Sequence, residues 1–292
     1  MISKITAIIV AIVTMISNLT GVIPSKQVYY SDVAYGTHER QVMDVCFPAD
    51  VSKSEGVILF IHGGGWMTGD KAAFAKRAQS TAKTVGCITA TMNYRYISKD
   101  IHCKDLLKDI DYALAKIKSM AETRGISCEK VMLVGISAGA HLSVLYSYVK
   151  KETAPITPCA VGVYSGPADL SSDSFIFDSS LLPTGETYKL LSYLTGTNLF
   201  LLNDTQRKRE LYKYSPLKYV AAGNVPTLVV HGALDEIVPI DDTYRFVDKL
   251  KKNGVPHTFI ELPDSGHGLD NDSYLMGKSD KVFVDFVNMY LK

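Results

Sequence analysis

The fold of this 292-residue chain is decided by the stretch Val131-Met132-Leu133-Val134-Gly135-Ile136-Ser137-Ala138-Gly139-Ala140-His141. Four apolar residues run into a Gly-x-Ser-x-Gly sequence, and residues 140–148 continue with the spacing of a helix. A strand that turns sharply into a helix at a serine is the setting of a nucleophile elbow. Glycine suits positions 135 and 139, because a side chain there would collide with the neighbouring strand or helix. The stretch therefore predicts Ser137 as a nucleophile above a sheet edge, and the alternative is an ordinary strand-to-helix turn that carries a serine.

Further apolar runs on both sides of this stretch read as strands, and amphipathic segments alternate with them. A polar turn at residues 36–40 separates two strand-like segments and predicts an antiparallel hairpin. The later alternation indicates an α/β fold with a mostly parallel central sheet and helices on both faces. Strands are expected over residues 27–36, 41–47, 57–61, 87–92, 160–164, 227–230 and 257–262, and helices over 71–84 with Asp70 as N-cap, 105–118, 242–250 and 280–291.

The segment between the strands at 160–164 and 227–230 is too long for an ordinary connection. It contains a cluster of serine and aspartate at residues 171–174 and two stretches with helical character. We predict a helical lid or cap over about residues 171–225, and the alternative is a crossover helix with decorated loops.

Two further residues complete a set for acyl transfer by serine. Asp235 follows the strand at 227–230, and His267 stands in a glycine-flanked loop after the strand at 257–262. In parallel sheets the active site gathers beyond the carboxyl ends of the strands. The order Ser137, Asp235, His267 predicts a triad in which His267 moves the proton and Asp235 orients its imidazole.

The sequence His62-Gly63-Gly64-Gly65-Trp66 follows the strand at 57–61, where an oxyanion loop belongs. Glycines let the backbone N–H groups face a substrate oxygen without obstruction. We assign the donors to Gly64, Gly65 and Ala138, with His62, Gly63, Trp66, Gly135 and Gly139 in supporting roles. We expect His62 to hold the loop by hydrogen bonds and His141 to pack within its helix. The other histidines (His38, His102, His231 and His257) show no usable pattern.

Composition and missing motifs argue against several kinds of binding partner. The formal net charge is +1 and no basic stripe is present, which argues against nucleic-acid binding. The sequence has no His-Glu-x-x-His, no carboxylate cluster with calcium spacing and no phosphate-binding loop, so we expect no metal. The five cysteines are scattered without a Cys-x-x-Cys pair, and one disulfide remains open if the protein is exported.

The amino-terminal residues read as a targeting segment. Lys4 precedes an apolar run over residues 5–16, which is short for a membrane span. We predict a signal peptide over residues 1–24, followed by one hydrolase-like domain over residues 25–292. An uncleaved anchor that attaches the protein to the outer face of a membrane is the alternative, and both imply export.

Several motifs together resemble the α/β-hydrolase superfamily over about residues 27–292. The sequence at 62–66 resembles the His-Gly-Gly-x-Trp signature of the branch related to hormone-sensitive lipase, carbohydrate esterases and arylformamidases. Four further stretches resemble recurring motifs of that branch: Met43-Asp44-Val45-Cys46-Phe47-Pro48, Asn93-Tyr94-Arg95, Ser215-Pro216-Leu217 and His231-Gly232-x-x-Asp235-x-x-Val238-Pro239. Ile136 stands where the hormone-sensitive lipase branch often has aspartate, which favours the sugar-esterase or formamidase side.

The resemblance implies hydrolysis of carboxylic esters with short acyl chains, on small-molecule or carbohydrate alcohols, without a cofactor. An arylformamidase or a peptidase-like amide hydrolase would use the same triad. A non-catalytic binding protein on this fold is an alternative from another class, but such a protein would be expected to have lost a triad member.

Overall fold

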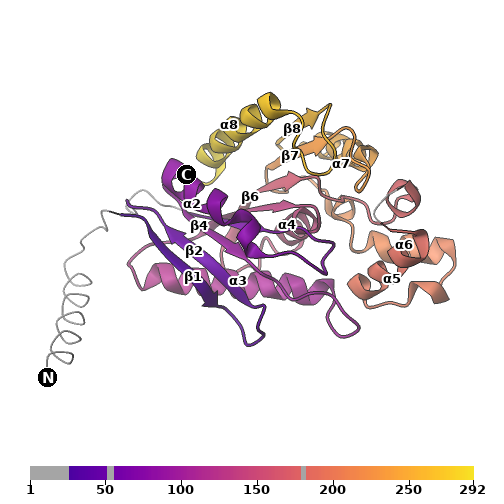
Figure 1. The fold of residues 1–292 in the computed structure, drawn as a ribbon, viewed down its shortest axis with the longest axis horizontal. Coiled ribbons are helices and arrows are strands. Elements are labelled where there is room, and N and C mark those ends of the chain that lie inside the picture. The colour runs from indigo at the N-terminus through magenta and orange to yellow at the C-terminus, as the bar shows by residue number, and fades with distance from the viewer. Residues whose placement is uncertain (1–25, 51–55, 179–181) are drawn as a thin grey trace, which may run out of the picture.

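The computed structural model describes residues 26–50, 56–178 and 182–292 (Figure 1). Their eight strands form one sheet in the order β1-β2-β4-β3-β5-β6-β7-β8, in which β1 and β2 are antiparallel to their neighbours and the remaining pairs are parallel. The predicted hairpin and mostly parallel sheet are thus confirmed. The strands are β1 (Val28–Ala34), β2 (Val42–Phe47), β3 (Gly56–Ile61), β4 (Ile88–Met92), β5 (Lys130–Ile136), β6 (Thr157–Tyr164), β7 (Thr227–Gly232) and β8 (His257–Leu262).

Helices cover both faces of the sheet, and the central strands serve both layers. In β3, Val57, Leu59 and Ile61 pack with one layer, whereas Ile58 and Phe60 pack with the other. Successive side chains of a strand point to opposite faces, so a run without polar residues is needed for a strand buried on both sides. One layer holds α2 (Ala75–Val85) and α8 (Ser273–Tyr290), and the other holds α3 (Cys103–Glu122), α4 (Ala138–Val149) and α7 (Ile240–Lys252).

Two helix starts differ from the expected ones by more than two residues. Asp70 caps as predicted by accepting from the Ala72 N–H at 2.9 Å, but the first turn is the 3₁₀ segment η1 (Lys71–Phe74), and α2 follows it. The helix expected over 280–291 already begins at Ser273. Its first turns carry exposed residues such as Tyr274, which is 83% exposed. Leu275 and Met276 of these turns are half-buried and pack against the core, so α8 contacts the sheet layer from its first turns onward.

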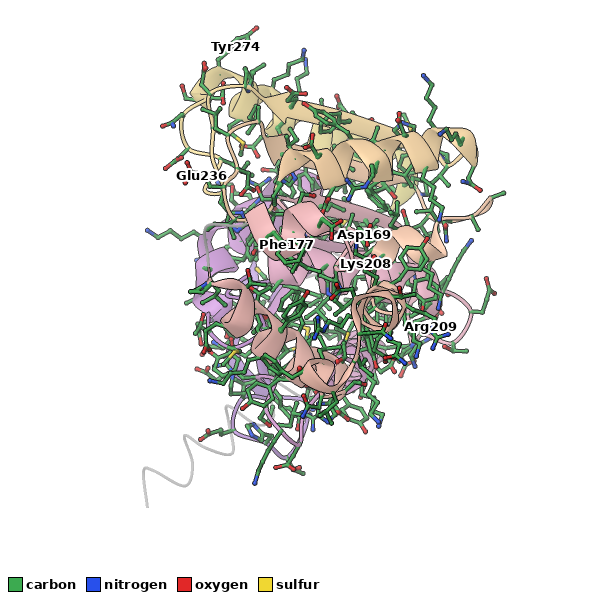
Figure 2. The ribbon with its side chains drawn as sticks, turned by 90° about the vertical axis from the view of Figure 1, so that its right-hand side faces the viewer. Asp169, Phe177, Lys208, Arg209, Glu236 and Tyr274 are labelled. Carbon is green, nitrogen blue, oxygen red and sulfur yellow. The ribbon has the colours of Figure 1, made fainter. Side chains whose placement is uncertain are left out.

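The long connection between β6 and β7 contains two helices, α5 (Thr184–Thr195) and α6 (Asp204–Tyr212), and the short turns η2 (Ser174–Asp178), η3 (Leu199–Leu201) and η4 (Pro216–Tyr219). The two helices lie side by side at one end of the molecule (Figure 1). Figure 2 looks onto this end, where Asp169 and Phe177 of the connection appear with Glu236 of the β7–α7 loop. A lid function for this connection stays a prediction.

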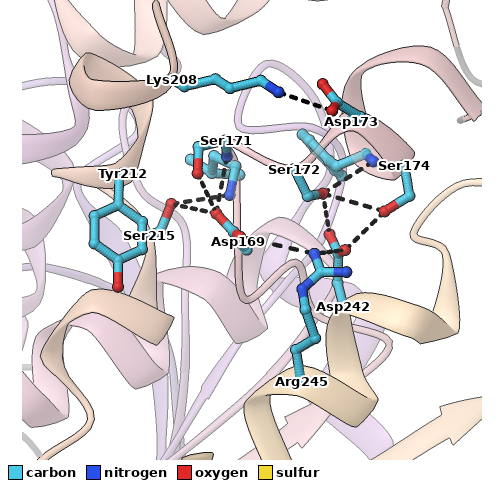
Figure 3. A network of polar contacts seen from close by, with 12 residues as sticks. Asp169, Ser171, Ser172, Asp173, Ser174, Lys208, Tyr212, Ser215, Asp242 and Arg245 are labelled. Carbon is cyan, nitrogen blue, oxygen red and sulfur yellow. Dashed lines mark hydrogen bonds and ion pairs between the residues drawn. The ribbon is translucent and has the colours of Figure 1, made fainter. Parts of the chain in front are cut away.

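A polar network links the start of the β6–β7 connection to helix α7 (Figure 3). The carboxylate of Asp242, in the first turn of α7, accepts from Ser172 Oγ at 2.7 Å and from Ser174 Oγ at 2.9 Å, and it pairs with Arg245. Burial raises the pKa of Asp242, although these donors partly offset that effect. The serine cluster at 171–174 is thus an anchor for the start of the connection.

Candidate active site

Ser137 occupies the sharp turn between β5 and α4. Its φ of 55° and ψ of −125° lie in a region that residues with side chains seldom adopt, which is the strain expected of a nucleophile elbow. A Cβ at Gly135 would lie 2.3 Å from the Gly139 backbone, and a Cβ at Gly139 would lie 2.1 Å from the Ile61 carbonyl oxygen. The two glycines therefore let the turn close against the end of β3.

Asp235 and His267 are joined by a hydrogen bond of 2.8 Å between Oδ2 and Nδ1. The other carboxylate oxygen of Asp235 accepts the N–H groups of Ile237 at 2.9 Å and Val238 at 2.8 Å. Burial alone would raise the pKa of Asp235, but the hydrogen bonds from His231, His267 and the Val238 N–H outweigh it and hold that pKa below its ordinary value. Asp235 thus remains a carboxylate that fixes the proton of His267 on Nδ1 and leaves Nε2 as the basic atom.

His231 is a fourth partner of the Asp235 carboxylate, and the sequence did not predict it. Its ring is fully buried at the end of β7, with Nε2 3.1 Å from Asp235 Oδ2 and 2.8 Å from the Val238 carbonyl oxygen. Nδ1 lies 2.8 Å from Thr243 Oγ1, so the hydroxyl donates to Nδ1 and Nε2 carries the proton. The position of His231, four residues before Asp235 at a strand end, was the available signal.

The structure does not join every member of the predicted triad. Within the described part of the chain, no hydrogen bond links Ser137 to His267. Ser137 follows β5, Asp235 follows β7 and His267 follows β8, so all three stand beyond the carboxyl ends of parallel strands in one sheet, with β6 between β5 and β7. In structures without substrate, such bonds are often long and tighten when the reactant binds.

Backbone hydrogen bonds fix the conformation of the glycine loop at residues 62–66. The Gly64 carbonyl accepts from the N–H groups of Met67 at 3.1 Å and Thr68 at 2.9 Å. A peptide unit is planar and trans, so fixing this carbonyl turns the Gly65 N–H to the opposite side. In the residues that the structure describes, the N–H groups of Gly64, Gly65 and Ala138 find no acceptor. Such unpaired N–H groups are what an oxyanion hole requires.

His62 and His141 are both buried and neutral, and each supports this loop. Burial, reinforced by the charge of Arg40, lowers the pKa of His62 to about 4, and its ring stacks on Tyr94 with centroids 4.3 Å apart. Burial likewise lowers the pKa of His141 to about 4. His141 meets the Trp66 ring edge-on at 5.2 Å and donates from Nε2 to the Tyr214 carbonyl at 2.8 Å. Neither ring is placed to act as a second base.

A small apolar cavity adjoins the elbow. Its volume is ≈ 40 Å³, and its walls come from the oxyanion loop, the elbow, the β6–β7 connection and the loop after Asp235. The lining residues are Gly65, Trp66, Ser137, Ala138, Pro167, Phe175, Leu182, Thr187, Leu190, Ile237 and Val238. The connection between β6 and β7 therefore shapes the space beside Ser137.

Other predictions concern features away from this site. The targeting segment predicted for residues 1–24 lies outside the described residues. Among the helices that are described, none combines the length and apolarity that a membrane crossing requires. In the same residues, no three His, Cys, Asp or Glu side chains gather as metal ligands would. All five cysteines are free thiols.

Comparisons with known proteins agree with this fold. The model of the BD-FAE family matches residues 43–250. Esterase LipC of Mycobacterium tuberculosis is 25% identical over 253 residues, covering 84% of this chain and 61% of LipC. LipM of the same organism, a probable carboxylic ester hydrolase, is 26% identical over 251 residues, covering 82% of this chain and 56% of LipM. The chain thus spans less than two thirds of either relative.

A solved structure gives the same result for the fold. Esterase B of Lactobacillus rhamnosis aligns with a TM-score of 0.71 at 17% identity, covering 99% of this chain and 93% of that one. At this identity the likeness concerns the fold alone.

Proposed function

The chain belongs to the BD-FAE family of α/β-hydrolases, and from that premise we propose that it is a serine hydrolase of carboxylic esters with short acyl chains. The observation that carries the proposal is the 2.8 Å Asp235–His267 bond, beside an elbow serine and three unpaired N–H groups. Names of relatives support the reaction type, since LipC is called an esterase and LipM a probable carboxylic ester hydrolase.

The proposed reaction runs through an acyl-enzyme. Ser137 Oγ attacks the ester carbonyl while His267 Nε2 takes its proton, and Asp235 stabilises the imidazolium that forms. The carbonyl oxygen becomes an oxyanion that accepts from the N–H groups of Gly64, Gly65 and Ala138. As the C–O bond to the alcohol breaks, His267 returns the proton to the leaving oxygen. Water then attacks the acyl-serine by the same route and releases the acid.

The cavity beside Ser137 supports the preference for short acyl chains. The cavity volume of ≈ 40 Å³ is small and its walls are apolar, so a short acyl group suits it better than a long one. The alcohol side of the substrate, a small molecule or a carbohydrate, extends away from this cavity.

The test is hydrolysis of p-nitrophenyl acetate by the full chain and by its Ser137→Ala variant. We expect a loss of at least ~10³-fold in kcat/KM, because a triad enzyme without its nucleophile retains only binding and the oxyanion hole. An inactive parent chain, or a variant as active as the parent, would refute the proposal.

We further propose that residues 1–24 direct export. The support is the sequence pattern alone, a lysine followed by a short apolar run. Expression of the chain with and without these residues, followed by cell fractionation, tests this. Equal retention of both forms inside the cell would contradict it.

A further inference from the structure

Arg40 belongs to the turn between β1 and β2, yet its side chain reaches the loops around the glycine motif. Its Nε donates to the Tyr94 carbonyl at 2.9 Å, and its Nη2 donates to the Gly69 carbonyl at 3.2 Å. The guanidinium also lies over the ring of Tyr96, 3.7 Å from its centroid. Hydrogen bonds in two directions and a ring beneath hold this half-buried group in one place.

The fixed guanidinium selects one tautomer of His62. Arg40 Nη2 lies 3.4 Å from His62 Nε2, and because a guanidinium has only donors, Nε2 must present its lone pair. On the other side of the ring, Nδ1 lies 2.7 Å from the Gly63 carbonyl oxygen, which can only accept. Both contacts therefore place the proton on Nδ1.

The bond from His62 to Gly63 orients a proposed oxyanion donor. The Tyr94 hydroxyl lies 3.1 Å from the His62 carbonyl oxygen and 3.3 Å from the Gly63 carbonyl oxygen, so its one proton is shared between them. Because the peptide unit is planar and trans, a carbonyl held from this side turns the Gly64 N–H to the opposite side. Gly63 itself packs on the elbow, since a Cβ there would lie 3.1 Å from Ser137 Cβ. The direction of the Gly64 N–H beside the nucleophile thus depends on the tautomer of His62.

We infer that Arg40 is a positioning residue for the oxyanion hole, acting through the tautomer of His62 and the carbonyl of Gly63. The inference rests on the proposed function, because it assigns Arg40 a part in stabilising the transition state of that reaction. It concerns a residue of the hairpin turn, which touches neither substrate nor the triad.

The first experiment compares Arg40→Gln with the parent chain on p-nitrophenyl acetate. Loss of one oxyanion donor costs about 10²–10³ in kcat. Misorientation costs less than removal, so we expect kcat to fall ~10- to 100-fold with KM nearly unchanged. Arg40→Lys serves if the glutamine variant does not fold, because lysine keeps the charge but lacks the fork that reaches both Tyr94 and His62. It should show the same loss.

Arg124→Gln is the matched control. The Arg124 guanidinium also packs against the hairpin, 4.9 Å from the ring centroid of Tyr30 and 4.4 Å from that of Phe47, and it donates to Tyr30 Oη at 2.6 Å. It contacts the hairpin away from the glycine loop. We expect this variant to keep kcat within about twofold, since surface substitutions away from special features have small effects.

A double-variant cycle tests whether Arg40 acts through His62 or only supports the structure in general. In His62→Asn, the side-chain amide can donate to the Gly63 carbonyl without help from Arg40. Adding Arg40→Gln to this background should therefore cause no further loss of kcat, whereas independent effects would multiply.

Nitrogen NMR of the His62 ring gives a readout that does not depend on turnover. The parent should show the Nδ1–H tautomer alone, and Arg40→Gln should show a mixture. Full activity of Arg40→Gln, an equal loss in both backgrounds, or an unchanged tautomer would each overturn the inference. An active Ser137→Ala variant would instead refute the proposed function, and the NMR result would still decide whether Arg40 sets the tautomer.

Discussion

Leu190→Ala is expected to lengthen the acyl chain that the site accepts. Leu190 lies on α5, is nearly buried, and forms part of the wall of the ≈ 40 Å³ cavity beside Ser137. The substitution removes three carbon atoms from that wall. Each methylene that an acyl chain then buries contributes about 0.8 kcal/mol, or ~4-fold in kcat/KM. Two further methylenes, from butyrate to hexanoate, correspond to about 1.6 kcal/mol, so the hexanoate-to-butyrate ratio should rise ~15-fold.

The assay measures kcat/KM for p-nitrophenyl esters from acetate to octanoate. Leu191→Ala is the matched control, because Leu191 is fully buried on the same helix but does not line the cavity. Both variants should lose stability, by about 2–5 kcal/mol for a buried leucine, and a ratio of two substrates cancels any loss of folded enzyme. An unchanged ratio in Leu190→Ala, or an equal change in Leu191→Ala, would refute the assignment of this cavity to the acyl group.

Two further predictions concern stability. Because the pKa of Asp235 is lowered in the folded state, the unfolded state protonates this carboxylate more readily than the folded state does. The ionised Asp235 therefore stabilises the fold above its ordinary pKa, and this stabilisation is lost as pH falls. Urea unfolding from about pH 6 to about pH 3 should therefore show a steeper loss of unfolding free energy for the parent than for Asp235→Asn, and parallel curves would contradict this. In Gly139→Ala the new Cβ would lie 2.1 Å from the Ile61 carbonyl oxygen, so the unfolding free energy should fall by about 3 kcal/mol or more. Gly185→Ala is the control, because open space surrounds that position and its unfolding free energy should hardly change. Equal unfolding free energies for the two variants would show that the elbow relaxes around the methyl group.

The sheet could be predicted from the sequence because its signals are local. The apolar runs at 57–61 and 131–134 are long enough to mark strands buried on both faces, and the structure places them side by side in register. The start of α8 was missed because its first turns are mixed: Leu275 and Met276 pack against the core, but exposed polar residues and Gly277 surround them.

The parts of the site that escaped prediction depend on contacts between distant residues. Arg40 meets the Tyr94 carbonyl across 54 residues, and Ser172 meets the Asp242 carboxylate across 70. No periodicity within either segment encodes such a meeting, because it follows from how the hairpin and the β6–β7 connection fold back onto the sheet. His231 was closer to prediction, four residues from Asp235, but its role depends on a ring orientation set by Thr243.

Covalent labelling identifies the residue that forms the acyl-enzyme, which we propose is Ser137. The full chain would be treated with an ester-mimicking phosphonate, digested, and mapped by mass spectrometry. We expect one adduct, on the peptide that contains Ser137, and no adduct in Ser137→Ala. Labelling of a different residue, or hydrolysis that continues in a chain fully labelled at Ser137, would contradict it.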